Sequence, residues 1–501
     1  MTGSLRPDAP LGVVDIGSNS VRLVGYGGAV RALRPIYNER SFCRLGAAVA
    51  ATGRIEGKPS EDALATLARF AALATRLGIE NLVAFATAAM REAENREDFL
   101  AEAEAVLGHP IRVLSGREEA LYCADGVMNA IPNADGIVAD LGGGSLELAC
   151  VAEGKTRHWA TLPIGLLALH EKSGRDRATA DKLVADALES VDWLAEGRKR
   201  PLYITGGTWR NLAYVHLTHA RYGLNVLHHY GVARREMKVF TSLIGGLSDR
   251  AAAKLTASSR NRRAALPMAA RILHQLLSAT RASEAVVSTH AVREGVLHAM
   301  RDKRHRARDP LLSACEEMAG RLCKSPDYGH ELAHWTRDIF RREDTDDPHT
   351  LDRLRVAACL ISDLAWAGHP NFRAEMISQT VLKAPFTAID HRGRVFLAQA
   401  LAWRYDVGHA PIDVGIRPAA GNKRRARALG LSFRLAHALS TSLPGLLPHS
   451  RLKVGKRKLR LEIDPSQKAL LAPIITKRLD LLAAALRLEA KIDVKKINPK
   501  E

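Results

Sequence analysis

Two short segments of this chain share a pattern that strongly constrains its fold. In each, an apolar strand ends at an aspartate, a turn containing glycine follows, and a second apolar strand begins. The segments read DIGSNS (residues 15–20) and DLGGGS (residues 140–145). After each one, short apolar strands alternate with amphipathic helices, up to about residue 300. This repetition of pattern predicts a duplicated α/β unit, although the two halves are not closely similar in sequence.

Both turns have the chemistry of a phosphate site. Glycine lets the backbone approach an anion closely, and consecutive N–H groups form a concavity that binds anions. Asp15 and Asp140 can hold a divalent cation, because hard cations take oxygen ligands. The alternative is that these turns are glycine hairpins without a ligand. That alternative explains a single such turn well, but it explains two matching turns headed by aspartate less well. Neither GxxxxGK[ST] nor GxGxxG is present in these turns, so they are not a P-loop or a dinucleotide fingerprint.

The chain of 501 residues is too long for a single hydrophobic core, which stops growing at about 250–300 residues. We predict one α/β domain over residues 1–128 and a second over 129–304, whose last helix can pack on the first domain. A charged segment ending in proline, residues 301–310, is the predicted linker. Residues 310–501 are predicted to form a helical domain with a small strand–helix piece at its end.

Apolar periodicity also predicts individual elements. A helix is expected over residues 60–77, after Pro59 and with Ser60 as its cap. Single continuous helices are expected over residues 88–107 and 178–196.

The charge balance favours a polyanionic partner. Lys and Arg number 73 against 54 Asp and Glu, a net charge of +19. Basic runs occur at residues 198–200, 260–263, 423–427 and 453–460. Each run alone is typical of a solvated face, but together they fit a long polyanion that passes several domains. Only 5% of residues are aromatic and none interleave with these runs, so nucleic acid is not expected as the partner.

Cysteine usage and hydropathy predict the compartment. Six cysteines are scattered without a CxxC pair, which argues against a disulfide framework or a zinc cluster. The N-terminus has no apolar run of signal-peptide length, and no stretch approaches the ~18–20 uncharged apolar residues that span a bilayer. We therefore expect a soluble, cytoplasmic protein without a membrane partner.

Longer motifs carry a family resemblance. VVDIGSNSVRL, FATAAMREAENR, LSGREEA, VADLGGGSLEL, YITGGTWRNLA and THAVREGVL follow one another between residues 11 and about 300. This series resembles the exopolyphosphatase / guanosine pentaphosphate phosphohydrolase (Ppx/GppA) family. The fold class that the resemblance implies is α/β followed by all-α. The α/β part would consist of duplicated actin-like (ribonuclease H-like) ATPase-superfamily domains, and the all-α part would be a helical HD-like region.

The implied activity is release of the terminal phosphate of inorganic polyphosphate as orthophosphate, with Mg²⁺ held near Asp15 and Asp140. Hydrolysis of guanosine pentaphosphate to the tetraphosphate is the alternative with the same fold. A non-catalytic sensor that binds polyphosphate or a nucleotide is the alternative of another class. An intact general base counts against the sensor, and family resemblance suggests a homodimer.

The resemblance also implies residue roles. Of Glu118 and Glu119, which point about 100° apart on a helix, only one can face the cleft. The family pattern makes that one Glu119, the general base that activates water. Arg91 would contact the terminal phosphate and Glu147 would help to fix the water. The implied phosphate-binding residues are Gly17, Ser18, Asn19, Ser20, Gly142, Gly143, Gly144, Ser145, Gly206, Gly207 and Thr208. The basic runs add a candidate polyphosphate channel of Arg262, Arg263, Lys423, Arg424, Arg425, Lys456 and Arg457.

The helical part resembles an HD metal-phosphohydrolase domain at residues 327–334 and 359–364. A working HD site needs an adjacent His-Asp pair, but Ser362 precedes Asp363 here. Loss of that ligand leaves a binuclear site incomplete. We expect a catalytically dead scaffold, in which His330 and His334 are surface or packing residues.

Overall fold

The computed structural model describes residues 10–28, 31, 33–174, 176–255, 260–341, 347–408, 412–416, 419 and 421–498. The chain divides into two compact units. The N-terminal unit comprises Met1–Tyr222 and Val226–Arg308, and the C-terminal unit comprises Gly223–Asn225 and Asp309–Glu501. The division falls at the predicted linker, where the chain forms a short helix, α13 (Lys303–Ala307). The boundary between residues 128 and 129 stays a prediction.

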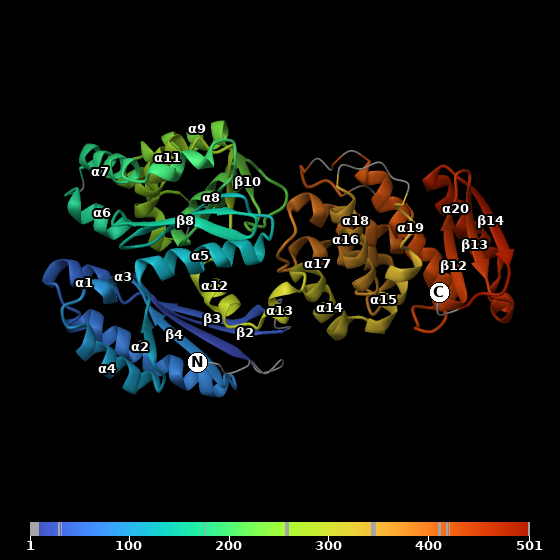
Figure 1. Ribbon diagram of the computed structural model, residues 1–501, viewed down its shortest axis with the longest axis horizontal. Helices are drawn as coiled ribbons and strands as arrows, with labels where there is room; N and C mark the ends of the chain where they lie inside the picture. The colour runs from blue at the N-terminus through green and yellow to red at the C-terminus, as the bar shows by residue number, and fades with distance from the viewer. Residues whose placement is uncertain are drawn as a thin grey trace. The chain divides into compact units, whose positions relative to one another are not determined.

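The N-terminal unit contains two mixed sheets with the same opening topology (Figure 1). Each begins with three antiparallel strands and then adds parallel strands beside the first of them. This repetition confirms the duplicated α/β unit. The first sheet has the order β3-β2-β1-β4-β5: β1 (Leu11–Ile16), β2 (Val21–Gly27), β3 (Arg34–Ser41), β4 (Asn81–Ala86) and β5 (Ile111–Val113). The second has the order β10-β11-β9-β6-β7-β8: β6 (Gly136–Leu141), β7 (Leu146–Ala152), β8 (Lys155–Leu162), β9 (Leu202–Thr205), β10 (Gly231–Ala233) and β11 (Glu284–Val287).

Helices cover both faces of these sheets (Figure 1). The helices in the part of the chain that forms the first sheet are α1 (Leu45–Thr52), α2 (Gly57–Arg76), α3 (Ala88–Glu92), α4 (Arg96–Leu107) and α5 (Gly116–Ala130). With the second come α6 (Leu166–Lys172), α7 (Arg177–Glu189), α8 (Gly207–His219), α9 (Arg234–Gly245), α10 (Asp249–Ala252), α11 (Leu266–Thr280) and α12 (Val292–Ala299), with 3₁₀ turns at Asp192–Gly197 and Arg260–Ala265.

Three helix boundaries differ from the predictions. The helix expected from Ser60 begins at Gly57, so Pro59 lies in its first turn, where a missing N–H costs nothing. The helix expected over residues 88–107 is interrupted, because Ala93 is extended and the Asn95 side chain bonds the backbone of Ile55. The helix expected over residues 178–196 ends at Glu189 and continues only as a 3₁₀ turn.

A shared core layer joins the two sheets. Val13 on β1 and Val138 on β6 face this layer, while their neighbours along each strand face the outer cores. Within the layer α5 packs against α12 at very close range. A Cβ added to Gly126 would lie 2.1 Å from the carbonyl oxygen of Ala291, and one on Gly295 would lie 1.8 Å from that of Tyr122. Glycine at this crossing therefore fixes α5, the helix that carries Glu119, against both sheets.

The C-terminal unit is a helical bundle with a small sheet. The helices are α14 (Pro310–Leu322), α15 (Pro326–Trp335), α16 (Pro348–Leu360), α17 (Arg373–Lys383), α18 (His391–Tyr405), α19 (Asn422–Ser440) and α20 (Pro473–Leu486). The sheet comprises β12 (Ser450–Val454), β13 (Lys458–Ile463) and β14 (Glu489–Val494), of which β14 runs parallel to β13. A 3₁₀ turn at Pro465–Leu470 precedes the last helix, α20. Among the described residues, no helix is long and apolar enough to cross a membrane.

Candidate active site

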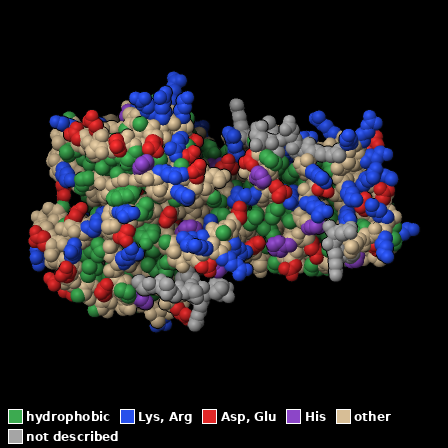
Figure 2. Space-filling view, in the orientation of Figure 1, with side chains coloured by type: hydrophobic (Ala, Val, Ile, Leu, Met, Phe, Trp, Pro, Cys, Tyr) green, Lys and Arg blue, Asp and Glu red, His purple; other side chains and the backbone are tan. Residues whose placement is uncertain are grey.

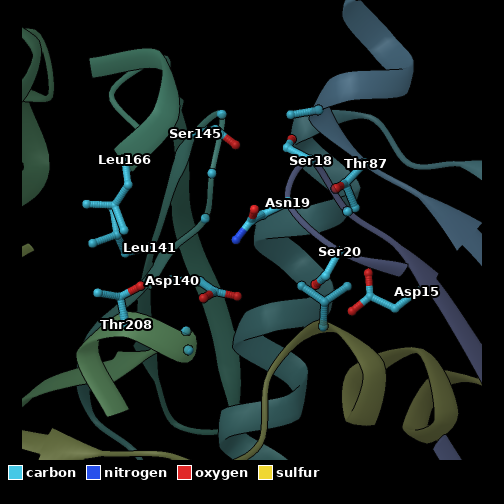
Figure 3. Close-up of a pocket in the computed structure, with 18 of the residues that line it drawn as sticks. Asp15, Ser18, Asn19, Ser20, Thr87, Asp140, Leu141, Ser145, Leu166 and Thr208 are labelled. Carbon is cyan, nitrogen blue, oxygen red and sulfur yellow. The ribbon is translucent and has the colours of Figure 1, made fainter. Parts of the chain in front are cut away.

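The two glycine turns line one cavity of about 1280 Å³, which is open to solvent. Figure 3 shows Asp140 and Ser145 on one side of it, and Ser18, Ser20 and Asp15 on the other. All the turn residues predicted to bind phosphate belong to its lining: Gly17, Ser18, Asn19, Ser20, Gly142, Gly143, Gly144 and Ser145. Gly206, Gly207 and Thr208 line it as well. The structure therefore brings together three loops that are far apart in the sequence.

The two turns have the same internal geometry. The amide of Gly17 donates to the carbonyl of Ser20 at 3.1 Å, and that of Gly142 donates to the carbonyl of Ser145 at 3.0 Å. In both loops other carbonyls accept bonds from the first turn of a following helix. The carbonyl of Ser18 accepts a hydrogen bond of 2.7 Å from an amide of α1. The carbonyl of Gly143 accepts one of 2.8 Å from an amide of α6. A peptide N–H points opposite the C=O of the same peptide group, so the amides of Asn19 and Gly144 point away from α1 and α6.

The loops approach each other too closely for larger residues. A Cβ on Gly144 would lie 2.8 Å from the Cβ of Ala88, and one on Gly143 would lie 3.2 Å from the Cβ of Ser18. The third loop is equally tight, since Gly206 has a φ of 91° and an added Cβ would lie 2.8 Å from an Asp140 oxygen. Glycine is thus required sterically at the floor of this cavity.

Glu119 lines the cavity from the first turn of α5. Arg91 donates to its Oε2 at 2.8 Å and to the Leu114 carbonyl at 2.8 Å. Burial raises the pKa of Glu119 to about 7 against the opposing charge of Arg91, and the carboxylates of Asp140 and Asp15 add to the rise. A carboxylate with this pKa can gain and lose a proton near neutral pH, as a general base must.

The neighbouring Glu118 has a structural role. Its Oε2 accepts from the backbone amide of Ser115 at 2.9 Å, while its own amide donates to the Ser115 hydroxyl at 3.2 Å. This reciprocal pair is a capping box that begins α5. The other oxygen of Glu118 pairs with Arg112. Glu118 is therefore occupied at the helix terminus, and it does not line the cavity among the described residues.

Three further carboxylates accompany Glu119. Burial raises the pKa of Asp140 to about 6 and also raises those of Asp15 and Glu147. Glu147 is 2% exposed, and its Oε1 has no hydrogen-bond partner among the described residues. Arg293 pairs with Asp15 at 3.2 Å. No three His, Cys, Asp or Glu side chains within the described ranges converge as a metal cage. Two carboxylates beside a phosphate site nevertheless suit Mg²⁺, which keeps several waters and takes few protein ligands.

A group of arginines lies on the cavity wall. Of these only Arg262 was predicted from the sequence. Arg22, Arg40, Arg210 and Arg293 line the same cavity with it. Burial lowers the pKa of Arg22 to about 10 and that of Arg262 to about 9, and neighbouring arginines lower both further. Arg262 also donates to the Gly207 carbonyl at 3.0 Å. The wall is thus a set of crowded positive charges that an anion would stabilise. Arg22, Arg210 and Arg293 lie within the motifs that carry the family resemblance, which was the available signal.

Other predicted site residues lie elsewhere. Arg91 is not part of the cavity lining and contacts Glu119 instead. Arg263 donates to the Ala253 carbonyl at 3.1 Å and does not line the cavity. The remaining channel residues belong to the C-terminal unit: Lys423, Arg424, Lys456 and Arg457 are exposed, whereas Arg425 is buried. Figure 2 shows Lys and Arg gathered over the strands and helix at the end of that unit.

The HD-like motif residues lie in the C-terminal unit. His330 and His334 are exposed on α15, while Asp363 is 4% exposed, just after α16. Asp363 is paired with Arg404 at 2.5 Å. A catalytically dead HD-like site stays a prediction.

Two family models match the chain. The Ppx/GppA phosphatase family model matches residues 25–304, and the model for the exopolyphosphatase C-terminal domain matches residues 311–489. Exopolyphosphatase 1 of Mycobacterium tuberculosis is 32% identical over 219 residues, which are 40% of this chain and 62% of that protein. Its counterpart in Mycobacterium leprae is 31% identical over 221 residues, covering 40% and 63%. The chain thus spans somewhat over three fifths of the length of these curated relatives.

Solved structures share the fold of part of the chain. An exopolyphosphatase from Cytophaga hutchinsonii has a TM-score of 0.54 at 21% identity, covering 58% of this chain and 97% of that one. The Ppx/GppA family member of Aquifex aeolicus has a TM-score of 0.51 at 25% identity, covering 58% and 96%. The expected fold class is confirmed as duplicated α/β domains followed by a helical region.

Proposed function

The chain belongs to the Ppx/GppA phosphatase family, and from that premise we propose that it is an exopolyphosphatase. The reaction is hydrolysis of the terminal phosphoric anhydride bond of inorganic polyphosphate, with release of orthophosphate. One observation carries the proposal: Glu119, with its raised pKa, shares one cavity with two glycine loops and a wall of arginines. A non-catalytic sensor would have no use for such a base.

The residues divide the work of phosphoryl transfer, which depends on positioning and on stabilising charge. The amides of the two glycine turns bind the terminal phosphate, and the hydroxyls of Ser18 and Ser145 donate to its oxygens. The arginine wall stabilises the charge of the next phosphates. Glu119 accepts a proton from the attacking water, and Arg91 keeps the carboxylate in position. Arg91 is thus a positioning residue.

Asp15 and Asp140 are the residues that would hold Mg²⁺. The unpartnered, buried Oε1 of Glu147 and the mutually raised carboxylate pKa values fit a nearby cation. When bound, Mg²⁺ neutralises phosphate charge. The homodimer stays a prediction.

The substrate is tested by comparing kcat/KM for long polyphosphate and for guanosine pentaphosphate on one enzyme preparation. We expect the higher value with polyphosphate. A higher value with guanosine pentaphosphate would make the nucleotide the substrate. No turnover of either compound would favour the alternative of a non-catalytic sensor.

The pH profile of kcat/KM should report Glu119. A general base works only when ionised, so the rate should rise with pH through about 7, the pKa of Glu119. Because the charge of Arg91 lowers this pKa, Arg91→Gln should move the rising limb to higher pH. The check is kcat/KM for a short polyphosphate between pH 5.5 and 8.5. A flat wild-type profile, or a limb that Arg91→Gln leaves in place, would contradict the assignment of the base.

The exposed basic residues of the C-terminal unit should matter for long chains only. Neutralising Lys423, Arg424, Lys456 and Arg457 together should raise KM for a long polymer and leave hydrolysis of tripolyphosphate nearly unchanged. By analogy with nucleic acids, each lost phosphate contact should reduce the salt slope of log K by somewhat under one unit. Equal losses on both substrates would indicate misfolding, and no loss on either would make these residues ordinary solvated surface.

A further inference from the structure

A separate cavity lies in the C-terminal unit, at the position where the HD-like motif ends. Among the described residues, Asp363 is the only carboxylate in its lining, whereas five Lys and Arg side chains share it. We call it the basic pocket and define it by those five residues: Lys324, Arg373, Arg404, Arg434 and Arg478. A metal-binding cavity needs the opposite balance, because cations take carboxylate and imidazole ligands.

The single carboxylate of the basic pocket is already neutralised. Arg404 and Asp363 are both buried and their side chains pair at 2.5 Å. Arg404 also donates to the Ser362 carbonyl and, at 3.0 Å, to the Ser442 hydroxyl. An arginine thus supplies the positive charge that stabilises Asp363, and it bonds the residue that stands in place of the missing histidine. The part of this lining that the structure describes holds no further carboxylate to balance the other four basic residues.

Three of those four cations are held in place by neutral groups. Arg434 donates to the Arg404 carbonyl at 3.0 Å, Arg478 donates to the Arg434 carbonyl at 2.7 Å, and Arg373 donates to the Gly368 carbonyl at 2.8 Å. Among the described residues none of the four forms an ion pair, and the Nε of Arg478 is buried without a hydrogen-bond partner. Carbonyl groups orient these side chains but do not neutralise their charge.

A neighbouring histidine responds to this excess of charge. Loss of hydration and the nearby Arg404 lower the pKa of His437 to about 4, so it is neutral at physiological pH. Its Nδ1 lies 2.9 Å from the Ser442 hydroxyl. The cavity therefore combines pre-oriented guanidinium groups, an unpartnered buried N–H and a strong positive field, which is the chemistry that recognises phosphate.

We propose that the basic pocket binds an oligophosphate group, separately from the active-site cleft. The guanidinium groups of this pocket line one cavity, in which the only carboxylate among the described lining residues is already paired with Arg404. The oligophosphate can be a free chain or the triphosphate of a nucleotide. Trp366 also lines the cavity and is 43% exposed, so its ring is available to stack on a base.

The test is calorimetric titration of tripolyphosphate into the full-length Glu119→Gln variant, which cannot consume it. We expect two sites per chain. Adding Lys324→Glu should weaken one of them at least about tenfold, as loss of a charged hydrogen bond does. Lys477→Glu is the matched control: it makes the same charge change on α20, but Lys477 does not line this cavity. It should leave both sites intact.

Further variants separate binding from folding. Arg478→Gln should remove the same site as Lys324→Glu, while Arg478→Lys should retain it, and thermal unfolding checks that each variant is folded. None of these changes should alter hydrolysis of tripolyphosphate by the otherwise wild-type enzyme. Equal weakening by Lys324→Glu and Lys477→Glu would overturn the proposal, because it would mean unspecific attraction. So would a single site that Lys324→Glu does not affect.

Further outcomes identify the ligand and distinguish the proposal for the basic pocket from the proposal for the active-site cleft. If adenosine triphosphate binds this site more tightly than tripolyphosphate does, and Trp366→Ala removes the difference, the source is a nucleotide. Equal affinities identify a free phosphate chain. If Glu119→Gln shows one site only and Lys324→Glu removes it, the basic pocket stands and the polyphosphate cleft fails.

Discussion

Glu119→Gln is expected to abolish orthophosphate release while polyphosphate still binds. The amide keeps the size of the side chain and can still meet Arg91, which donates to Glu119 at 2.8 Å. It cannot accept a proton from water, and loss of a general base typically costs about 10²–10⁴ in rate. Single-turnover kinetics with saturating polyphosphate measure the rate, and calorimetry measures binding.

Glu118→Gln is the matched control, since it makes the same chemical change one residue away. Glu118 caps α5 and pairs with Arg112 outside the cavity lining. Its replacement should cost a little stability, about 1 kcal/mol for a weakened cap, and leave kcat nearly unchanged. If Glu118 proves essential and Glu119 dispensable, the catalytic assignment on α5 is wrong.

The arginine wall should show a second large effect. Arg22→Ala combined with Arg262→Ala should weaken polyphosphate binding by about 10²–10³-fold, since each removes a charged hydrogen-bond donor from the cavity. The same change should leave the ligand-free protein at least as stable as wild type. The reason is that burial, together with repulsion from neighbouring arginines, lowers the pKa of both residues, so each charge is disfavoured in the empty cavity.

Thermal unfolding with and without polyphosphate tests both halves of this expectation. Polyphosphate should raise the Tm of the wild type more than it raises the Tm of the double variant. Without the ligand, the variant should have a Tm equal to or higher than that of the wild type. Arg263→Ala is the control, because Arg263 is adjacent in sequence but bonds the Ala253 carbonyl outside the lining. A double variant that binds polyphosphate normally would contradict a phosphate role for the wall.

The sequence predicted best the elements that are buried on both faces. β1 and β6 read as apolar runs, because Val13, Val14, Ile137 and Val138 are all covered. The beginning of α5 at Ser115 also depends on a local pattern, the capping box. By contrast β3 and β8 were missed. They lie at sheet edges, and partial exposure leaves them without an apolar alternation.

The site was predictable where it depends on local sequence. The glycine turns and Glu119 come from short motifs, and the structure brings them to one cavity. The arginine wall depends instead on tertiary convergence: Arg22 comes from β2, Arg210 from α8 and Arg293 from α12. The contact of Arg91 with Glu119 could not be read either, because a long side chain can reach several partners and only the fold selects one.

The central claim is that this cleft removes orthophosphate from the end of a polyphosphate chain with the help of Glu119. The most direct measurement follows long polyphosphate and its products over time, with wild type and with Glu119→Gln. The account predicts that orthophosphate is the only early product of the wild type, while the polymer shortens from its ends, and that Glu119→Gln releases none. Fragments of intermediate length, or orthophosphate release by Glu119→Gln at the wild-type rate, would contradict it.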